Sequence, residues 1–350
     1  MKKQKKIILI LAAVLLLLAA AVVFLWSRFG QRAERYQCTN FAMGTNIQQT
    51  VYGKEAKAAV TAAAQNIGEL ENLISWQADG SDADKINQAA GTDWVSIDAK
   101  TTKLLQTCLR VSSDSGGAFD PTILPVASLW DFGGSNQHVP EEAEIQKYLK
   151  YIGFQNFRIN AAENTVSLRN HYMGIDLDGV EKGAACDEAV AAYKSSGADC
   201  GIIAAGASVG TYGTKADGSA WSIAVRDPAS SSDNASAMGE ISLSSGFVST
   251  VGTYQNSFTK NGILYYPLLN PKTGHPQSNG LVSVTVVSGS GVLSDALANA
   301  CFILGREKSI SLLNKYSAEA IFIDNSNRVF VTESLKAKFT VTNGRYSLQP

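Results

Sequence analysis

Three residue patterns that build common functional sites are scarce in this chain of 350 residues. Only three histidines are present, His138, His171 and His275, which excludes a histidine-rich metal site. The five cysteines are widely spaced and form no CxxC pair. They are expected to be buried as small apolar residues, although one disulfide between Cys186 and Cys200 stays open if the domain lies outside the cytoplasm.

An excess of positive charge is also lacking. Lysine and arginine total 30 against 31 acidic residues, for a net charge of −1. Four of those lysines lie within the first six residues, so the rest of the chain is more acidic still. No basic surface for nucleic acid is therefore indicated, and nucleic acid is not expected as a partner.

The N-terminus carries the one long apolar run. Lysines at positions 2, 3, 5 and 6 precede Ile7 to Trp26, a stretch without charge or proline that is long enough to cross a bilayer as a helix. The lysines place the N-terminus inside the cell. We expect a cytoplasmic segment at 1–6, a transmembrane signal-anchor at 7–26, a spacer at 27–37 and one extracytoplasmic domain at 38–350, at a bacterial cell membrane. The alternatives are a cleaved signal peptide and a lipoprotein modified at Cys38.

Hydrophobic periodicity indicates an α+β domain. Helices are expected at 56–73, 101–113, 140–149, 183–195 and 294–304, with another helix start after 80–84. Short alternating runs predict strands at 166–168, 202–203, 221–225, 240–243 and 282–286. Many strands follow one another without a crossover helix, so the sheets should be antiparallel or mixed. The Ser- and Asp-rich residues 229–237 are expected to form a surface loop.

The first segment that suits a ligand is 116–122, which reads GGAFDPT. Its glycines permit close backbone approach, and Asp120 is held extended before Pro121, which should direct its carboxylate away from a fixed turn. The alternative is an Asp-Pro turn that only caps a helix.

The second segment, 175–187, is expected to pass from strand to helix through Asp178 and Gly179. A helix start presents backbone N–H groups and a positive dipole to an anion, and Lys182 in its first turn adds a charge. The alternative is helix capping by Asp178.

The third segment is the expected helix 294–304, where Asp295 and Asn299 lie four residues apart and project from one face. A carboxylate in such an apolar helix needs a cation or a donor. Magnesium takes a few protein oxygens together with substrate phosphates, so the three segments predict a site for a metal-bound polyphosphate. The alternative is an N-cap formed by Ser294 or Asp295.

The order of these segments, with Met43-Gly44-Thr45 before them and Gly305 after them, resembles the ApbE-like FAD:protein FMN transferases over most of the chain. Phe41 to Thr45 is similar to the family's opening strand, and Trp76 stands where the family has an aromatic residue before a turn. The resemblance implies a T-fold-like α+β architecture, FAD as substrate and Mg²⁺ as cofactor. It also implies transfer of FMN from FAD to a Thr or Ser hydroxyl of an extracytoplasmic redox protein, with release of AMP.

The same resemblance assigns site residues but no catalytic residue. The FAD contacts are Met43, Trp76, Ala118, Phe119, Asp120, Asp176, Lys182 and Leu268. The metal ligands are Gly179 through its backbone carbonyl, Asp295 and Asn299, where the family usually has threonine.

Three family motifs are altered. The family pattern His-x-x-Asp-Pro-x-Thr-Gly reads PLLNPKTG at 267–274, so Pro267 and Asn270 replace both ionisable groups. The Ser-Gly-x-Tyr pattern reads VGTY at 251–254, and the Asn-x-Gly-Gly-Asp/Asn pattern reads AAGAS at 204–208. The missing histidine removes one candidate for the base that deprotonates the acceptor hydroxyl.

These changes keep three other functions open. Water could replace the acceptor, which would make the protein an FAD pyrophosphatase. The fold and pocket could persist in a catalytically weak flavin-binding or scaffold protein. Residues 206–208 could themselves accept FMN, the alternative being an ordinary turn after a strand.

Overall fold

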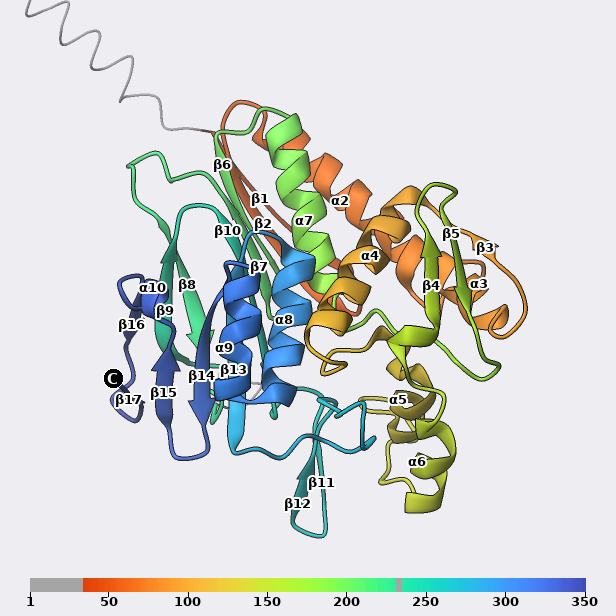
Figure 1. The fold of residues 1–350 in the computed structure, drawn as a ribbon. Coiled ribbons are helices and arrows are strands. Elements are labelled where there is room, and N and C mark those ends of the chain that lie inside the picture. The colour runs from red at the N-terminus through yellow and green to blue at the C-terminus, as the bar shows by residue number, and fades with distance from the viewer. Residues whose placement is uncertain (1–33, 231–234) are drawn as a thin grey trace, which may run out of the picture.

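The computed structural model describes residues 34–230 and 235–350 as an α+β fold (Figure 1). Its strands are β1 (Arg35–Ala42), β2 (Thr45–Tyr52), β3 (Val95–Ser96), β4 (Phe157–Asn160), β5 (Thr165–Leu168), β6 (Cys200–Ala205), β7 (Ser208–Tyr212), β8 (Trp221–Arg226), β9 (Ala237–Leu243), β10 (Gly246–Gly252), β11 (Phe258–Lys260), β12 (Ile263–Tyr265), β13 (Leu281–Ser288), β14 (Glu319–Asp324), β15 (Arg328–Val331), β16 (Phe339–Val341) and β17 (Ser347–Leu348). Its helices are α2 (Ala56–Ile74), α3 (Asp82–Gln88), α4 (Ala99–Asp114), α5 (Leu124–Trp130), α6 (Glu142–Leu149), α7 (Glu181–Ser195), α8 (Gly291–Leu304), α9 (Arg306–Lys315) and α10 (Glu333–Lys336), with 3-10 turns η1 (Pro121–Ile123) and η2 (Phe154–Asn156).

A nine-stranded sheet organises the chain, in the order β1-β2-β6-β7-β10-β13-β14-β15-β17. Its neighbours pair antiparallel except β15 and β17, which are parallel. The pairing of β2 with β6 joins segments that most of the helices separate in sequence. The expectation of a mixed or antiparallel sheet is confirmed.

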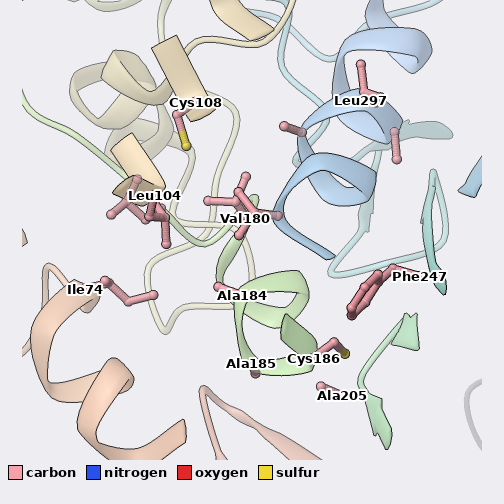
Figure 2. Close-up of a cluster of buried hydrophobic side chains, with 14 of the residues drawn as sticks. Ile74, Leu104, Cys108, Val180, Ala184, Ala185, Cys186, Ala205, Phe247 and Leu297 are labelled. Carbon is pink, nitrogen blue, oxygen red and sulfur yellow. The ribbon is translucent and has the colours of Figure 1, made fainter. Parts of the chain in front are cut away.

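One face of this sheet carries the helical layer. Helix α7 packs between α2 and α8, and α8 also contacts α4 and α9. Side chains from four helices meet strand residues such as Ala205 and Phe247 in one buried cluster (Figure 2). Their contributions include Ile74 from α2, Leu104 from α4 and Leu297 from α8. This core fixes the start of α7 next to the first turns of α8.

The opposite face of the sheet is covered by the three-stranded sheet β16-β9-β8. Alternation along β14 explains the two layers, because successive strand side chains point to opposite faces. Ala320 and Phe322 join the helical core, whereas Ile321 and Ile323 join the core under β8 and β9. A small lobe of α5 and α6 has its own core around Trp130.

Several boundaries differ from those expected from sequence. Helix α8 begins at Gly291, three residues before the expected start, because Ser290 is its N-cap. The proposed N-cap role of Ser294 or Asp295 is therefore wrong. Strand β1 begins at Arg35, so the last three residues of the expected spacer belong to the folded domain.

The expectation that the cysteines are buried as small apolar residues is largely confirmed. All five cysteines are free, so the alternative disulfide between Cys186 and Cys200 is wrong. Four are buried, and Cys38 is half-buried.

The expected membrane anchor at 7–26 lies outside the described residues, as does part of the expected loop 229–237. Within 34–230 and 235–350, no helix is both long and apolar enough to cross a membrane.

Candidate active site

The site forms where the N-terminal turns of α7 and α8 touch backbone to backbone. A methyl group added at Gly183 would overlap the carbonyl group of Gly291, and one added at Gly291 would overlap the carbonyl group of Gly183. Only glycine allows this approach. The contact brings the 176–183 segment against the first turns of α8.

Each of these helices caps the other. Asp187 of α7 accepts hydrogen bonds from the backbone N–H groups of Gly291 and Val292 at 2.8 and 3.0 Å. Asp295 of α8 accepts one from the N–H of Gly183 at 2.6 Å. The first turn of α7 has no side-chain cap from its own N-cap residue, Val180, so Asp295 supplies that acceptor. The alternative in which Asp178 caps this helix is wrong.

Asp295 is 7% exposed, and its second oxygen accepts a 2.7 Å hydrogen bond from Ser208 Oγ of β7. Burial raises the pKa of Asp295, although its bonds to serine hydroxyls and to the Gly183 N–H oppose that shift. A buried carboxylate with a raised pKa is electrostatically suited to a nearby cation.

Lys182 provides the nearest positive charge. Its Nζ lies 2.6 Å from Glu181 Oε1. Its stem crosses the β6–β7 turn, since a methyl group on Gly206 would lie 3.4 Å from Lys182 Cδ. Burial lowers the pKa of Lys182, but the surrounding carboxylates, Glu181 first, outweigh burial, so the pKa is raised overall. The ammonium group of Lys182 therefore stays charged in the first turn of α7.

Two acidic groups beside Lys182 titrate near neutrality. Burial, opposed mainly by Lys182, raises the pKa of Glu181 to about 7. Burial and the adjacent Asp178 carboxylate raise the pKa of Asp176 to about 7. Perturbed groups of this kind gather at functional sites.

Asn299 and Gly179 meet at the edge of this corner. The side-chain N–H of Asn299 donates to the Gly179 carbonyl oxygen at 3.1 Å and to the Asp295 carbonyl oxygen at 3.0 Å. A methyl group on Gly179 would lie 3.7 Å from the Phe119 ring. All three predicted metal-ligand residues are therefore adjacent. The ring of Phe119 brings the segment 116–122 next to them.

These residues offer oxygen donors of the kind that Mg²⁺ accepts, one carboxylate, one amide and one backbone carbonyl. In the described part of the chain no group of three or more His, Cys, Asp or Glu side chains could hold a metal. A metal here would need additional ligands from water or from substrate phosphates.

The orientation of the Asp120 carboxylate differs from the one expected from the sequence. Its carboxylate folds back onto its own turn, where one oxygen accepts from the N–H and the hydroxyl of Thr122 at 2.9 and 2.7 Å. The other oxygen accepts from Phe154 N–H at 2.9 Å. Burial raises the pKa of Asp120 despite these bonds. The alternative reading, a capped Asp-Pro turn, is confirmed, and the expected outward carboxylate is wrong.

Met43 and Trp76 flank helix α2, Met43 in the β1–β2 turn and Trp76 just after the helix ends. Met43 and Gly44 form the β1–β2 turn with φ of 50° and 67°, so the expected opening strand is a hairpin corner here. The N–H of Met43 donates to Glu71 at 2.7 Å. Trp76 is half-buried, and its buried indole Nε1 has no hydrogen-bond partner, which leaves a donor for a ligand.

Comparison with known proteins now decides the family. The sequence model described as "ApbE family" matches residues 43–322. The chain belongs to the ApbE family. Two relatives, both named FAD:protein FMN transferase, support this membership. That of Treponema pallidum is 28% identical over 336 residues, covering 91% of this chain and 92% of the relative. That of Vibrio cholerae is 26% identical over 314 residues, covering 87% and 92%.

Solved ApbE structures have the same fold. The ApbE protein from Thermotoga maritima has a TM-score of 0.80 at 28% identity, covering 87% of this chain and 99% of that structure. The flavin transferase ApbE from Vibrio cholerae has a TM-score of 0.77 at 22% identity and supports the fold alone.

The altered ApbE motif at 267–274 forms a tight hairpin. Leu268 is buried in the helical core. Asn270 Oδ1 accepts from Lys272 N–H at 2.9 Å, and the Gly274 carbonyl accepts from the Trp130 indole N–H at 2.9 Å. Asn270 thus holds a turn, and Pro267 is an exposed residue with no titratable group.

Gly206 and Ala207 form the β6–β7 turn and Ser208 begins β7, as the ordinary-turn interpretation expected. Ser208 is 4% exposed, and its hydroxyl donates to Asp295. A buried, engaged hydroxyl is unsuited to accept FMN from another molecule, so this alternative loses its support.

Sequence reasoning missed Glu181 and Asp187, and it considered Ser208 only as a possible FMN acceptor and not as a partner of Asp295. Glu181 stood beside a predicted lysine, and its acidic charge in a buried first turn could have flagged it. Asp187 and Ser208 act through partners far away in sequence, so no local pattern could have shown them.

Proposed function

We propose that this protein transfers FMN from FAD to a Thr or Ser hydroxyl of an extracytoplasmic redox protein and releases AMP, in a Mg²⁺-dependent reaction. The observation that carries this proposal is the crossing of α7 and α8, where the N–H of Gly183, next to Lys182, donates to Asp295 and the side chain of Asn299 donates to the Gly179 carbonyl. The shared family and the names of the relatives give the reaction class.

The predicted contacts divide into two sets. Asp295, Asn299 and the Gly179 carbonyl would hold Mg²⁺, and their donor chemistry fits that ion. Met43, Trp76, Ala118, Phe119, Asp176, Lys182 and Leu268 would bind FAD, with Asp120 shaping the loop that presents Ala118 and Phe119. Bound magnesium would neutralise charge that develops on the phosphates.

The transfer step conserves atoms and charge. The acceptor oxygen forms a bond to the FMN phosphorus while the bond from that phosphorus to the bridging oxygen breaks, and AMP leaves with the electron pair. The acceptor hydroxyl loses one proton to solvent water, which balances the extra negative charge on the AMP phosphate. Lys182 orients the phosphates for this displacement.

Incubation of the full-length chain in detergent with FAD, Mg²⁺ and a flavinylation-motif peptide tests the proposal. We expect AMP and a fluorescent peptide whose mass has increased by that of FMN less water. Asp217→Asn is the matched control, since this carboxylate is exposed in the β7–β8 loop and lies outside the proposed metal set.

The other functions predict different products. Acceptor-independent release of FMN and AMP would indicate a pyrophosphatase. Tight FAD binding without turnover would indicate a binding or scaffold protein, which the replacement of both ionisable groups at Pro267 and Asn270 favours. Either result would refute the transferase.

A further inference from the structure

Strand β1 forms one edge of the nine-stranded sheet, and β2 is its only strand partner among the described residues. It is eight residues long, and neither a proline nor a bulge interrupts it. Outside its ladder with β2, no backbone–backbone hydrogen bond in the described part of the chain involves residues 35–42. Proteins usually protect such an edge with charges, proline or a covering element, whereas Arg35 is the one charged residue of β1. The edge is therefore open to another extended chain.

The turn after β1 fixes which of its main-chain groups face outward. The two-residue loop at 43–44 has positive φ at both positions, a geometry in which the two flanking residues form a hydrogen-bonded pair. At the other end of the ladder, the N–H of Gly53 donates to the Glu34 carbonyl at 2.9 Å. Bonded and non-bonded pairs alternate along an antiparallel ladder, so both ends give the same pattern. The residues whose N–H and C=O groups point away from β2 are Arg35, Gln37, Thr39 and Phe41.

This open edge ends beside Lys182. Thr45, the first residue of β2, pairs with Ala42, the last residue of β1. A methyl group on Gly206 would lie 3.5 Å from Thr45 Oγ1 and 3.4 Å from Lys182 Cδ, so Thr45 and Lys182 meet at the same turn. Neighbouring strands lie about 4.8 Å apart. A strand added to β1 would therefore run about 10 Å from Thr45 and would leave the edge close to the proposed phosphate-binding residues.

The chemistry of the edge determines its partner. A row of unpaired N–H and C=O groups is complementary to an extended polypeptide, and Phe41, which is 72% exposed, adds apolar surface next to the turn. The proposed reaction requires a polypeptide that presents a Thr or Ser hydroxyl. We infer that the acceptor segment binds β1 as an added strand, with its hydroxyl-bearing residue just past the turn at 43–44. This assignment rests on the proposed function.

The substitution Thr39→Pro tests this docking surface. Proline removes the outward N–H of residue 39 and leaves the ladder with β2 intact, which is the setting in which an edge strand accepts proline. The full-length chain is assayed in detergent with FAD, Mg²⁺ and the flavinylation-motif peptide. We expect the KM for the peptide to rise about fivefold or more, while kcat and the affinity for FAD stay unchanged.

Ala224→Pro is the matched control on a second open edge. Strand β8 is the edge of the sheet β16-β9-β8, and Ala224 is exposed there. The N–H of Ser242 donates to the Lys338 carbonyl at 2.8 Å, so the even-numbered residues of β9 bond to β16. Ala224 lies opposite Glu240, and its N–H therefore also points outward. This variant should leave the KM for the peptide unchanged.

Hydrogen exchange of residues 35–42, followed by mass spectrometry, needs no turnover and no variant. The probe is the same peptide with its acceptor threonine replaced by valine, added to the wild-type chain with FAD. We expect at least two amide hydrogens of this segment to exchange more slowly, because strand addition pairs the outward N–H groups.

The outcomes separate this inference from the proposed function. Absence of protection, or an unchanged KM in Thr39→Pro, would overturn the β1 assignment even if the chain transfers FMN. Protection by the peptide in a chain that never transfers FMN would support the docking surface and contradict the transferase. Protection that rises with protein concentration in the absence of peptide would indicate a second copy on this edge and would also overturn the assignment.

Discussion

Two buried aspartates show that residue type alone does not determine the role of a side chain in this fold. Asp120 and Asp295 both stood out in the sequence, and both are buried with raised pKa values. Asp120 uses three hydrogen bonds within its own loop and with η2. Asp295 instead joins α8 to α7 and β7. The proposed metal ligand is thus the one whose partners come from different elements.

The substitution Asp295→Asn tests the proposed role of Asp295 as a metal ligand. The amide can still accept from Gly183 N–H and donate to Ser208, so the free energy of unfolding should fall by only about 1 kcal/mol. The affinity for Mg²⁺ in the transfer assay should fall at least about tenfold, because a charged oxygen is lost. Mg²⁺ titrations of the initial rate measure this effect. A Mg²⁺ dependence equal to that of the Asp217→Asn control would contradict the assignment.

Glu181 makes stability depend on pH. Its pKa is about 7 in the folded protein and near 4.5 when unfolded, so folding favours the protonated form. Its contribution is full below about pH 4.5 and is lost as pH rises towards 7. Glu181→Gln should match the wild type at pH 4 and exceed its free energy of unfolding by about 1 to 3 kcal/mol at pH 8. Urea unfolding in EDTA at both pH values measures this, and an equal difference at both would refute it.

At the scale of elements, the decisive unit is the crossing of α7 and α8. Two glycines permit the contact, and two aspartates cap the opposite helix across it. Each helix start therefore depends on the other, so the position of Lys182 relative to Asn299 is set by packing.

Gly183→Ala should break this crossing. Its methyl group would overlap the Gly291 carbonyl, and backbone cannot move aside as a flexible side chain can. We expect a loss of about 1 to 3 kcal/mol in the free energy of unfolding, and lost FAD binding. Gly68→Ala is the matched control, because nothing lies within 4 Å of its added methyl group in α2. It should stabilise the protein by about 0.5 to 1 kcal/mol. Thermal and urea unfolding compare the two, and equal effects would contradict the close contact.

At the scale of the whole molecule, the nine-stranded sheet carries helices on one face and a second sheet on the other. The site lies on the helical side, where β6–β7, α7 and α8 meet. The proposed membrane anchor precedes β1, the edge strand of the same sheet.

The expected membrane anchor at residues 7–26 leads to a prediction about the whole molecule. The full chain should sediment with membranes and resist alkaline carbonate extraction, because residues 7–26 are long enough to span the bilayer. A chain beginning at residue 31 should stay soluble and keep the FAD affinity of the full chain, since β1 begins at Arg35. Mass spectrometry of the mature protein provides the check. A chain shortened after the apolar run, or a lipid on Cys38, would contradict the anchor.

Local patterns predicted most of the elements. The boundaries of helix α2 lie within one residue of expectation and those of α4 within two, because the apolar spacing of each helix is a local signal. The start of α8 was missed because its cap involves Ser290 together with Asp187 from another helix. Lys182, Gly179, Asp295 and Asn299 were found as motifs, and the structure places them together.

The sequence by itself determined the α+β class, the family resemblance and the residue types of a polyphosphate site, because these depend on periodicity and short motifs. Tertiary structure alone decided which aspartate serves the turn and which joins two helices, and it placed the end of β1 near Lys182. The physical reason is that a carboxylate's hydrogen bonds and a lysine's surroundings depend on groups far away in the chain. Such groups become neighbours only when α7 and α8 cross and the sheet closes beneath them.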